Sequence, residues 1–414
     1  MRVLVVTQYF WPENFLINDL CSELVKRGHE VTVLTGKPNY PSGVVFDEYI
    51  NNSTQFEHYV GCNVVRVPMV ARGKGRAIKL ILNYFTYAFS ATFIGAWKLR
   101  KKQFDVIFVF EPSPIMVGLP AIFLKKLKKA PIVFWVQDLW PETLEAIGVV
   151  KSQWLLDLVG KLVSFIYNGS DLILGQSKPF LHGIRLYSND ATKIKYFPNW
   201  SEGSLSNSVV SPVEAITKHE GFLKILFAGN IGDAQDFPAI LKSVERIKKN
   251  QIKAKFFIVG DGRSFEWVKS EILKRHLQDY MYLLGRYPVE KMLAFYSSVD
   301  VLLVTLKESP VFAMTIPSKV QSYMTAGKPI LTMLTGEGSR IIEEANCGLI
   351  AKSGDYKVLS ENIEKMSMMN KGELDALGLK ARAYSEREFD RDKLISQLEE
   401  WFVDLSAQRK EGHS

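Results

Sequence analysis

The 414-residue sequence predicts an α/β protein made of two doubly wound parallel sheets, one after the other along the chain. Short apolar runs alternate with helical stripes, this alternation breaks near residue 201, and a second alternating set begins near residue 221. The length suits two domains of about 200 residues each, because longer chains divide into several cores. An apolar fraction of 47% and a charged fraction of 23% are typical of a folded protein.

The first half contains five apolar runs that we interpret as buried parallel strands. They cover residues 2–8, 30–35, 105–110, 132–137 and 171–176. An aromatic loop at residues 9–14 follows the first run, and Leu16, Leu20 and Leu24 then form a helical stripe that ends at Gly28. Helical stretches between the other runs predict one doubly wound domain over residues 1–200.

Residues 201–220 are rich in Ser, Asn, Val and Pro without a clear period, which predicts a linker. A second set of strands follows at residues 224–228, 255–259, 281–284, 301–305 and 329–333. We therefore expect a second Rossmann-like domain over residues 221–389, facing the first across a cleft, with ligands beyond the carboxyl ends of the strands. Residues 390–414 contain a last helix that is expected to pack across the domain boundary. Its apolar face carries Leu394, Leu398, Trp401, Phe402 and Leu405.

The formal charge of +8 suits an anionic partner such as a sugar nucleotide, a lipid diphosphate or a membrane surface, and the spread of basic residues does not favour nucleic acid. Cys21, Cys62 and Cys347 are odd in number and far apart, so we interpret them as small buried residues. No His, Asp and Glu cluster has metal-ligand spacing, so we expect no metal and no cofactor. The N-terminus enters an apolar strand without a signal peptide, which favours the cytoplasm or the inner face of a membrane.

Residues 80–97 carry no charge, are rich in Phe, Tyr, Leu and Ile, and have basic residues on both sides within residues 72–102. A buried helix, a helix lying at a membrane interface with its basic flanks on anionic head groups, and a membrane span are the three interpretations. A span is disfavoured because it would place two parts of one sheet on opposite sides of the bilayer.

The segment 316–319, which reads Ile-Pro-Ser-Lys, predicts a helix start that binds phosphate. Pro317 is expected in the first turn, and Gly327 with Pro329 at the end of the helix. Free backbone N–H groups and the helix dipole at such a start attract anions. Lys319 adds a cation at the positive end of the dipole, which is favourable when an anion lies between them; an exposed surface lysine is the alternative. We expect Pro317, Ser318 and Lys319 to contact the donor.

Three glycine turns at the ends of predicted strands accompany this helix start. They read Gly-Asn-Ile-Gly-Asp-Ala-Gln at 229–235, Gly-Asp-Gly at 260–262 and Gly-Arg-Tyr at 285–287. Glycine lets backbone amides approach phosphate closely, and the carboxyl ends of neighbouring strands meet at one sheet edge. The turns therefore predict a nucleotide-diphosphate pocket. Its expected donor-binding residues are Gly229, Asn230, Gly232, Gln235, Asp261, Gly262 and Arg286.

The order of these motifs resembles the C-terminal half of glycosyltransferase family four, which has the GT-B fold. The resemblance rests on the glycine loop, Val-Gly-Asp-Gly at 259–262, Leu-Gly-Arg at 284–286, and a Pro-Ser-Lys helix that ends in Met-Thr-Ala-Gly-Lys-Pro at 324–329. Gln-Asp-Leu-Trp-Pro-Glu at 137–142 is similar to the N-terminal half. Residues 229–235, 316–323 and 336–345 are similar to the WbuB-type branch of O-antigen and capsule transferases, which is associated with N-acetyl-L-fucosamine.

The sequence departs from the family where the donor binds. Met314 and Ser322 stand where many members carry two glutamates, the second of which binds the donor ribose. Gln235 and Asp236 stand where members often carry an arginine and a lysine that neutralise the diphosphate. Gln321 or Ser322 are therefore the candidates for the ribose contact, and Lys319 with the helix start is the main candidate for the charge of the diphosphate.

Asp138 is the candidate catalytic residue of the first half. It follows a strand, and a carboxylate there could accept a proton from the acceptor hydroxyl or contact a donor-sugar hydroxyl; a helix N-cap is the alternative. Glu142 is a second candidate on the acceptor side. Glu13 and Asn14 lie in the first strand–helix loop, where family members approach diphosphate and acceptor. His29 begins a strand and is expected to face solvent.

The resemblance implies a retaining, metal-independent glycosyltransferase with a UDP-sugar donor, expected to be UDP-N-acetyl-L-fucosamine. The acceptor is expected to be an undecaprenyl-diphosphate-linked sugar, with the enzyme peripheral on the cytoplasmic face of a bacterial inner membrane. With Lys319 and Asp138 as the catalytic pair, a same-face mechanism is favoured because no nucleophile pair is visible. A UDP-sugar epimerase of the same two-domain shape and a non-catalytic sugar-nucleotide-binding subunit are the alternatives.

Overall fold

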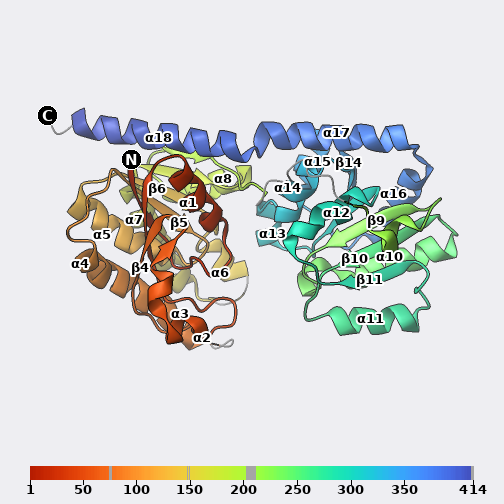
Figure 1. Ribbon diagram of the computed structural model, residues 1–414, viewed down its shortest axis with the longest axis horizontal. Helices are drawn as coiled ribbons and strands as arrows, with labels where there is room; N and C mark the ends of the chain where they lie inside the picture. The colour runs from red at the N-terminus through yellow and green to blue at the C-terminus, as the bar shows by residue number, and fades with distance from the viewer. Residues whose placement is uncertain (74–76, 147, 149, 202–210, 412–414) are drawn as a thin grey trace. The chain divides into compact units, whose positions relative to one another are not determined.

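The computed structural model describes residues 1–73, 77–146, 148, 150–201 and 211–411, and it divides into two compact units (Figure 1). Unit 1 comprises Met1–Pro198 with Arg391–Ser414, and unit 2 comprises Asn199–Asp390. Each unit has its own parallel sheet with helices on both faces, which confirms the α/β fold class expected from the sequence.

Unit 1 is built on an eight-stranded sheet of order β3-β4-β2-β1-β5-β6-β7-β8. Its strands are β1 (Arg2–Val6), β2 (Glu30–Thr35), β3 (His58–Tyr59), β4 (Cys62–Arg66), β5 (Val106–Glu111), β6 (Ile132–Val136), β7 (Leu172–Gly175) and β8 (Ile194–Tyr196). All neighbours run parallel except the edge pair β3–β4, which is antiparallel. Its helices are α1 (Leu16–Lys26), α2 (Asp47–Asn51), α3 (Ala77–Ser90), α4 (Ala96–Lys98), α5 (Gly118–Lys128), α6 (Glu142–Ala146), α7 (Gln153–Gly169), α8 (Lys178–Tyr187) and α18 (Arg391–Glu411).

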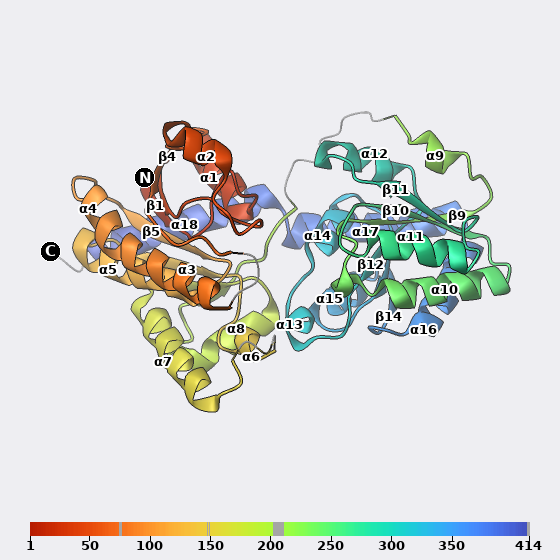
Figure 2. The same ribbon diagram turned by 90° about the horizontal axis from the view of Figure 1, so that it is seen from below.

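Successive residues of β6 show how the two faces of this sheet are covered. Phe134 points to one face, where it packs beside Gly118 of α5 and Tyr167 of α7. Trp135 points to the other, where its ring meets Phe108, and Phe108 in turn meets Phe402 of α18. The layer of α3, α5 and α7 therefore covers one face, and α18 lies on the other (Figures 1 and 2). Fully buried strands on both sides explain the continuous apolar runs in the sequence.

The last helix, α18, is fastened to unit 1 by its apolar face and by charges. Leu398 and Phe402 are fully buried. Arg391 binds Asp19 of α1 at 2.7 Å, and Glu399 accepts a hydrogen bond from Arg27 at 2.8 Å. The expectation that His29 faces solvent is wrong, because its Nε2 lies 2.6 Å from Glu399 and its side chain is only 10% exposed.

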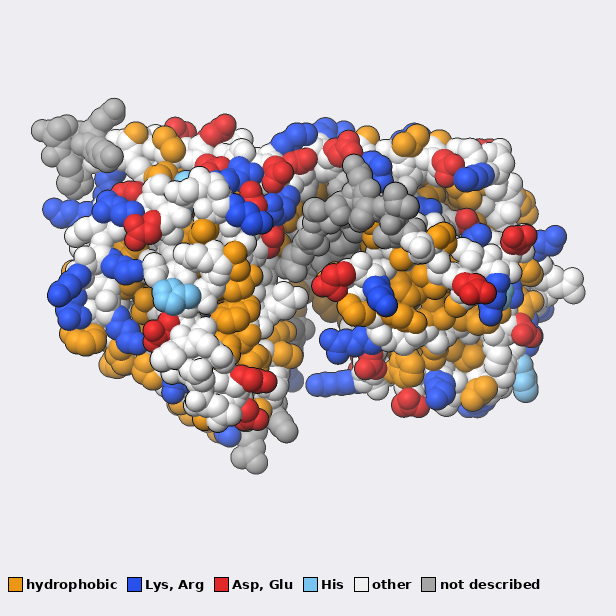
Figure 3. All heavy atoms as spheres, viewed as in Figure 1, with side chains coloured by type: hydrophobic (Ala, Val, Ile, Leu, Met, Phe, Trp, Pro, Cys, Tyr) orange, Lys and Arg blue, Asp and Glu red, His pale blue; other side chains and the backbone are white. Residues whose placement is uncertain are grey.

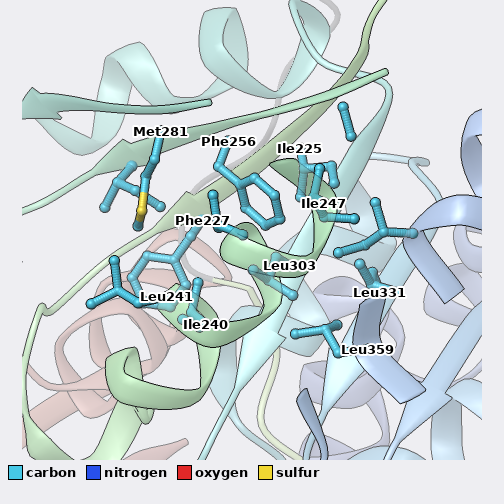
Figure 4. Packing of buried hydrophobic residues seen from close by; sticks show 14 of the residues in the cluster. Ile225, Phe227, Ile240, Leu241, Ile247, Phe256, Met281, Leu303, Leu331 and Leu359 are labelled. Atoms are coloured by element: carbon cyan, nitrogen blue, oxygen red, sulfur yellow. The ribbon is translucent and has the colours of Figure 1, made fainter. Parts of the chain in front are cut away.

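Unit 2 contains a six-stranded, all-parallel sheet of order β11-β10-β9-β12-β13-β14. Its strands are β9 (Leu223–Ala228), β10 (Ala254–Val259), β11 (Met281–Gly285), β12 (Val301–Thr305), β13 (Ile330–Met333) and β14 (Gly348–Ala351). Its helices are α9 (Glu214–Thr217), α10 (Phe237–Lys249), α11 (Phe265–Lys274), α12 (Met292–Ser297), α13 (Pro310–Met314), α14 (Ser318–Thr325), α15 (Glu337–Ala345), α16 (Tyr356–Met368) and α17 (Lys371–Glu388). In its core, Phe227 lies beside Ile240 and Leu241 of α10, and Phe256 of β10 belongs to the same buried cluster (Figure 4).

Part of the segment expected to be a linker is folded. Helix α9 buries Ile216 completely against unit 2, and Val213 donates its N–H to Ser298 at 2.8 Å. This part of the chain lacks a visible period because a four-residue helix is too short to show one. Residues 202–210 of the expected linker lie outside the described residues.

The charge-free segment 80–97 is half-buried along its length. It runs through α3, a π-helical turn at Ala91–Gly95, and α4. Tyr84 and Tyr87 face the core, whereas Phe89 and Trp97 on the opposite side are 66% and 62% exposed. Among the described residues, no helix is both long and apolar enough to cross a membrane. Lys74 and Arg76 of the basic flank lie outside the described part of the chain.

Candidate active site

The glycine turns of unit 2 meet at the carboxyl ends of β9, β10 and β11. Gly229 N–H binds the carbonyl of Val259, Ile231 N–H binds that of Asp261, and Gly260 N–H binds that of Gly285, each at 2.8 Å. A Cβ on Gly260 would lie 1.8 Å from the carbonyl oxygen of Gly229, so only glycine fits there. The three turns expected from the sequence thus form one continuous backbone surface.

We expect Gly260→Ala to disrupt this surface. The added Cβ meets backbone rather than a flexible side chain, so the Gly229 turn must move by more than an ångström. UDP binding should weaken at least about tenfold, because misplaced groups lose much of their binding energy. Titration calorimetry with UDP measures this. Gly372→Ala in α17, where the nearest atom to the new Cβ is a side-chain oxygen at 3.2 Å, is the control and should bind UDP normally.

Helix α14 starts beside the Gly229 turn and is held there by Tyr323. The Tyr323 hydroxyl accepts a hydrogen bond from the N–H of Ala228 at 2.9 Å. Pro317 is the N-cap, with a ψ of 132°, and not a first-turn residue as expected, because the helix begins one residue later, at Ser318. Tyr323 therefore aims the free N–H groups of the first turn toward the end of β9.

Lys319 lies against this turn with its charge unpaired. A Cβ on Gly229 would lie 2.6 Å from the Lys319 Cε, and the Lys319 Nζ is 3.6 Å from the centroid of the Phe227 ring. The Nζ is buried and has no hydrogen-bond partner among the described residues. Burial alone lowers the pKa of Lys319 to about 7. An unpaired buried ammonium is costly, and an anion beside it removes that cost.

The remaining donor-side candidates divide into loop-shaping and accessible residues. Gln235 shapes the turn, since its Oε1 accepts hydrogen bonds from Gly232 N–H at 3.1 Å and from the Asn230 side chain at 3.4 Å. Asp261 also folds back, accepting the N–H of Gly262 at 2.7 Å. Asn230, Ser318 and Arg286 are exposed to solvent and therefore accessible to a ligand.

The structure places Gln321 away from an open position, contrary to the expectation of a ribose contact. Gln321 is 1% exposed, and its Nε2 donates to the carbonyl of Asn199 at 2.5 Å. The Gln321 side chain therefore contacts Asn199, the first residue of unit 2, and does not face solvent. Ser322 is partly exposed and pairs with the hydroxyl of Ser201 at 3.3 Å, which leaves it as the candidate for the ribose.

Asp138 lies just beyond the carboxyl end of β6 in unit 1, and it is partly exposed. Its carboxylate accepts hydrogen bonds from the Thr143 hydroxyl at 2.6 Å and the Trp140 indole at 3.2 Å. Burial raises the pKa of Asp138, and these bonds, with one from Ser113, oppose the rise. The side chain is thus held in one orientation with donors that favour its charged form, as a general base requires.

Glu142 begins α6 and faces a pocket. Together with Tyr187 and Lys161 it lines a cavity of about 430 Å³ between α6, α7 and α8. One carboxylate oxygen is buried without a partner among the described residues, and burial raises the pKa of Glu142.

The Glu13 carboxylate is buried and supports the loop after β2. One oxygen accepts the N–H groups of Asn39 and Tyr40 at 2.7 Å, and the other accepts that of Phe10 at 3.1 Å. The side chain is 2% exposed, and burial raises its pKa to about 7. Asn14, next in sequence, is exposed. Of these two neighbours in the first strand–helix loop, Asn14 is the one whose side chain is accessible to an acceptor.

The sequence did not predict two buried polar groups that lie near Asp138. These groups are the side chains of Glu111 and Tyr167. Glu111 ends β5 and is fully buried, and a glutamate closing a strand buried along its whole length was the available signal. Tyr167 has no comparable signal, because its burial depends on the packing of α7. Among the described residues, no group of three or more His, Cys, Asp or Glu could hold a metal ion.

Comparison with known families assigns both halves of the chain to glycosyltransferases. Residues 16–200 match the glycosyl transferase 4-like domain, and residues 213–383 match glycosyl transferases group 1. The chain belongs to these glycosyltransferases and is an enzyme of that class, with the GT-B fold.

Three particular proteins show how similar this chain is to other glycosyltransferases and to a solved structure. The chain is 30% identical over 258 residues to glycosyltransferase WbjE, described as probable, of Pseudomonas aeruginosa, covering 59% of this chain and 61% of the relative. It is 23% identical to a protein described as the colanic acid biosynthesis glycosyl transferase WcaI of Escherichia coli (strain K12), covering 96% and 98%. The crystal structure of Anabaena Alr3699/HepE in complex with UDP matches with a TM-score of 0.70 at 12% identity, covering 98% and 100%.

Proposed function

We propose that this protein is a retaining, metal-independent transferase that moves a sugar from a UDP-sugar to a lipid-linked acceptor in polysaccharide assembly. The observation that carries the proposal is Lys319, a buried and unpaired cation between the start of α14 and the Gly229 turn. A diphosphate there would meet the ammonium, the N–H groups of α14 and the glycine backbone together. These fixed donors stabilise the charge of the departing UDP without a metal.

UDP is the nucleotide in this proposal, and N-acetyl-L-fucosamine is the sugar. The choice of UDP is supported by the HepE structure, which has a similar fold and was solved in complex with UDP. The choice of N-acetyl-L-fucosamine rests on the resemblance of residues 229–235, 316–323 and 336–345 to the WbuB-type branch. Asp138 is the base that accepts the proton of the acceptor hydroxyl.

The acceptor in this proposal is an undecaprenyl-diphosphate-linked sugar, and the enzyme is peripheral on the cytoplasmic face of the bacterial inner membrane. The membrane contact is supported by the exposed aromatic side chains of α3 and of the π-helical turn Ala91–Gly95 that follows it. The rings of Phe89 and Phe93 contact each other in a tilted arrangement with centroids 4.8 Å apart, and the Phe93 ring lies 6.1 Å from that of Phe123 of α5. Figure 3 shows hydrophobic side chains along the lower left edge of unit 1, where α3 and α4 lie. Basic residues such as Lys79 and Arg100, both of which are exposed, flank this segment in the sequence, as in helices that bind anionic membranes.

Replacing both Phe89 and Phe93 by aspartate should release the protein from membranes. The two rings are 66% and 55% exposed, so the folded state should tolerate the change, while the added charges oppose insertion and repel anionic lipid. Sedimentation with vesicles of phosphatidylglycerol and phosphatidylethanolamine measures the bound fraction, which should fall at least about tenfold. Leu379→Asp, at a 68% exposed position of α17, is the control. Equal binding by the double variant and the wild type would rule out α3 as the contact.

A screen of UDP-sugars against an undecaprenyl-diphosphate-linked acceptor, read by mass, tests the function. We expect one UDP-sugar to lengthen the acceptor by one sugar with release of UDP. Interconversion of a UDP-sugar without acceptor would instead show an epimerase. Binding of UDP-sugars without turnover on any acceptor would show a non-catalytic subunit.

A further inference from the structure

Glu111 and Asp138 form a pair of carboxyl groups at the ends of adjacent strands. Glu111 is the last residue of β5, and Asp138 follows β6, which pairs with β5 in parallel up to Glu111↔Val136. The Oε2 of Glu111 accepts the backbone N–H of Asp138 at 3.4 Å. The two acidic groups are therefore neighbours in space although 27 residues separate them in the chain.

The surroundings of the two carboxyls differ in a way that assigns their charges. Asp138 is partly exposed and accepts the Thr143 hydroxyl and the Trp140 indole. Glu111 is 0% exposed, and its Oε1 has no hydrogen-bond partner within the described residues. A carboxylate needs donors to replace its water shell, and of these two carboxyls only Asp138 has side-chain donors among the described residues. Two neighbouring carboxyls with such different environments hold different charges.

We propose that Glu111 is a positioning residue for Asp138, a carboxyl that keeps its proton in the folded protein, holds the backbone of Asp138 in place and leaves Asp138 as the only anion of the pair. The inference rests on the proposed function in one respect, because Asp138 is the base of the transfer there. The protonation of Glu111 itself does not depend on it.

The other groups that face this pair agree with a neutral Glu111. Tyr84 of α3 and Tyr167 of α7 are buried phenols that interact with both carboxyls, and burial raises the pKa of each. The charge of Glu142 also raises the pKa of Tyr167, and the charge of Arg72 lowers that of Tyr84. Within the part of the chain that the structure describes, no cation forms an ion pair with Glu111. Its pKa is raised well above the usual range by burial and then by the charge of Asp138, and backbone hydrogen bonds from Asp138 and Gln137 oppose the rise.

A carboxyl of this kind lowers the stability of the protein as pH rises. Glu111 binds its proton more tightly in the folded state than in the unfolded chain, where its pKa is about 4.3. Above about pH 5 the folded state therefore holds a proton that the unfolded state has released, and stability falls with increasing pH. A glutamine at position 111 would have nearly the same shape as glutamate and would stay neutral at every pH. The Glu111→Gln variant should therefore not lose stability in this way as the pH rises.

The first test is the melting temperature of unit 1 in the wild type and in Glu111→Gln between pH 5 and pH 8.5. The two should melt alike near pH 5, and the variant should melt about 3 °C higher or more at pH 8. Glu145→Gln, which removes an exposed carboxylate from α6, is the control and should show no such growth. A difference between wild type and Glu111→Gln that stays constant with pH would overturn the proposal.

The second test is sugar transfer by Glu111→Gln and Glu111→Ala. The glutamine variant should retain kcat within about threefold at pH 7. The wild type should lose activity at alkaline pH, where Glu111 becomes an anion beside Asp138. The variant should not show this loss, because glutamine stays neutral. The alanine variant leaves the Asp138 N–H without its acceptor, so kcat should fall at least about tenfold with an unchanged KM for the UDP-sugar. A glutamine variant as inactive as Asp138→Asn would show that Glu111 transfers protons itself, against the proposal.

The two tests also separate this inference from the proposed function. If the wild type transfers no sugar to any acceptor, the proposed function fails, and the melting data still decide whether Glu111 keeps its proton. If transfer occurs but the melting difference does not grow with pH, the function stands and the inference about Glu111 fails.

Discussion

Lys319→Met should reduce sugar transfer by about 10²- to 10³-fold, which is the usual effect of removing one fixed donor from a developing anion. Lys319 contacts the Gly229 turn, and the two family positions that often carry further phosphate-binding cations hold Gln235 and Asp236 here. The diphosphate would therefore lose its main charge partner. Binding of UDP, measured by titration calorimetry, should weaken together with turnover.

The low pKa of Lys319 gives this prediction a pH dependence. Burial lowers the pKa to about 7 in the free protein, and a bound diphosphate raises it again, so a proton is taken up on binding above pH 7. UDP affinity of the wild type should fall by up to about tenfold per pH unit above pH 7, whereas the affinity of Lys319→Met should lack this fall.

The matched control is Lys242→Met. Lys242 also lies over an aromatic ring, that of Tyr356 at 5.4 Å, but it is exposed. It should keep full UDP affinity. The melting temperature of Lys319→Met should not fall, because the change removes an unpaired buried charge. Normal UDP binding by Lys319→Met at all pH values would refute the assignment of the phosphate site.

Phe402→Ala should destabilise unit 1 by about 3–5 kcal/mol, the usual cost of truncating a fully buried aromatic side chain. Phe402 is 0% exposed in α18, and its ring meets Phe108 of β5 at 5.8 Å. The loss is comparable to the total stability of many domains, so unit 1 should be largely unfolded near 37 °C. Chemical unfolding, followed by tryptophan fluorescence, measures it.

The neighbouring substitution Val403→Ala is the control, since Val403 is 55% exposed and should cost less than about 0.5 kcal/mol. The Phe402→Ala variant should still bind UDP, because the glycine turns and α14 lie in unit 2, whereas α18 belongs to unit 1. If both substitutions cost the same, α18 is not part of the core of unit 1.

Local patterns are enough to predict the sheets and the helix start of the donor site. Strands such as Glu30–Thr35 and Val301–Thr305 match the expected ranges, because strands buried on both faces are continuous apolar runs. Glycine after a strand, and Pro-Ser-Lys before a helical stripe, are likewise local chemistry. Lys319 could therefore be singled out before its surroundings were known.

The roles of the acidic residues depend on contacts that no local pattern contains. The Glu13 carboxylate accepts hydrogen bonds from the backbone N–H groups of Asn39 and Tyr40, which are 26 and 27 residues away in the sequence. Glu111 is a neighbour of Asp138 only because β5 and β6 are adjacent in the sheet. Burial and charge pairing, which decide whether a carboxyl is a support, a base or a neutral partner, are properties of the packed chain.

The sequence by itself determined the two parallel sheets, the glycine turns and the position of Lys319 at a helix start, because each follows from residue order over a few turns. Only the tertiary structure decided that Lys319 is buried and unpaired, that α18 belongs to the core of unit 1, and that α3 exposes Phe89 and Phe93. The physical reason is that desolvation depends on which elements cover a residue, and distant parts of the chain supply that cover.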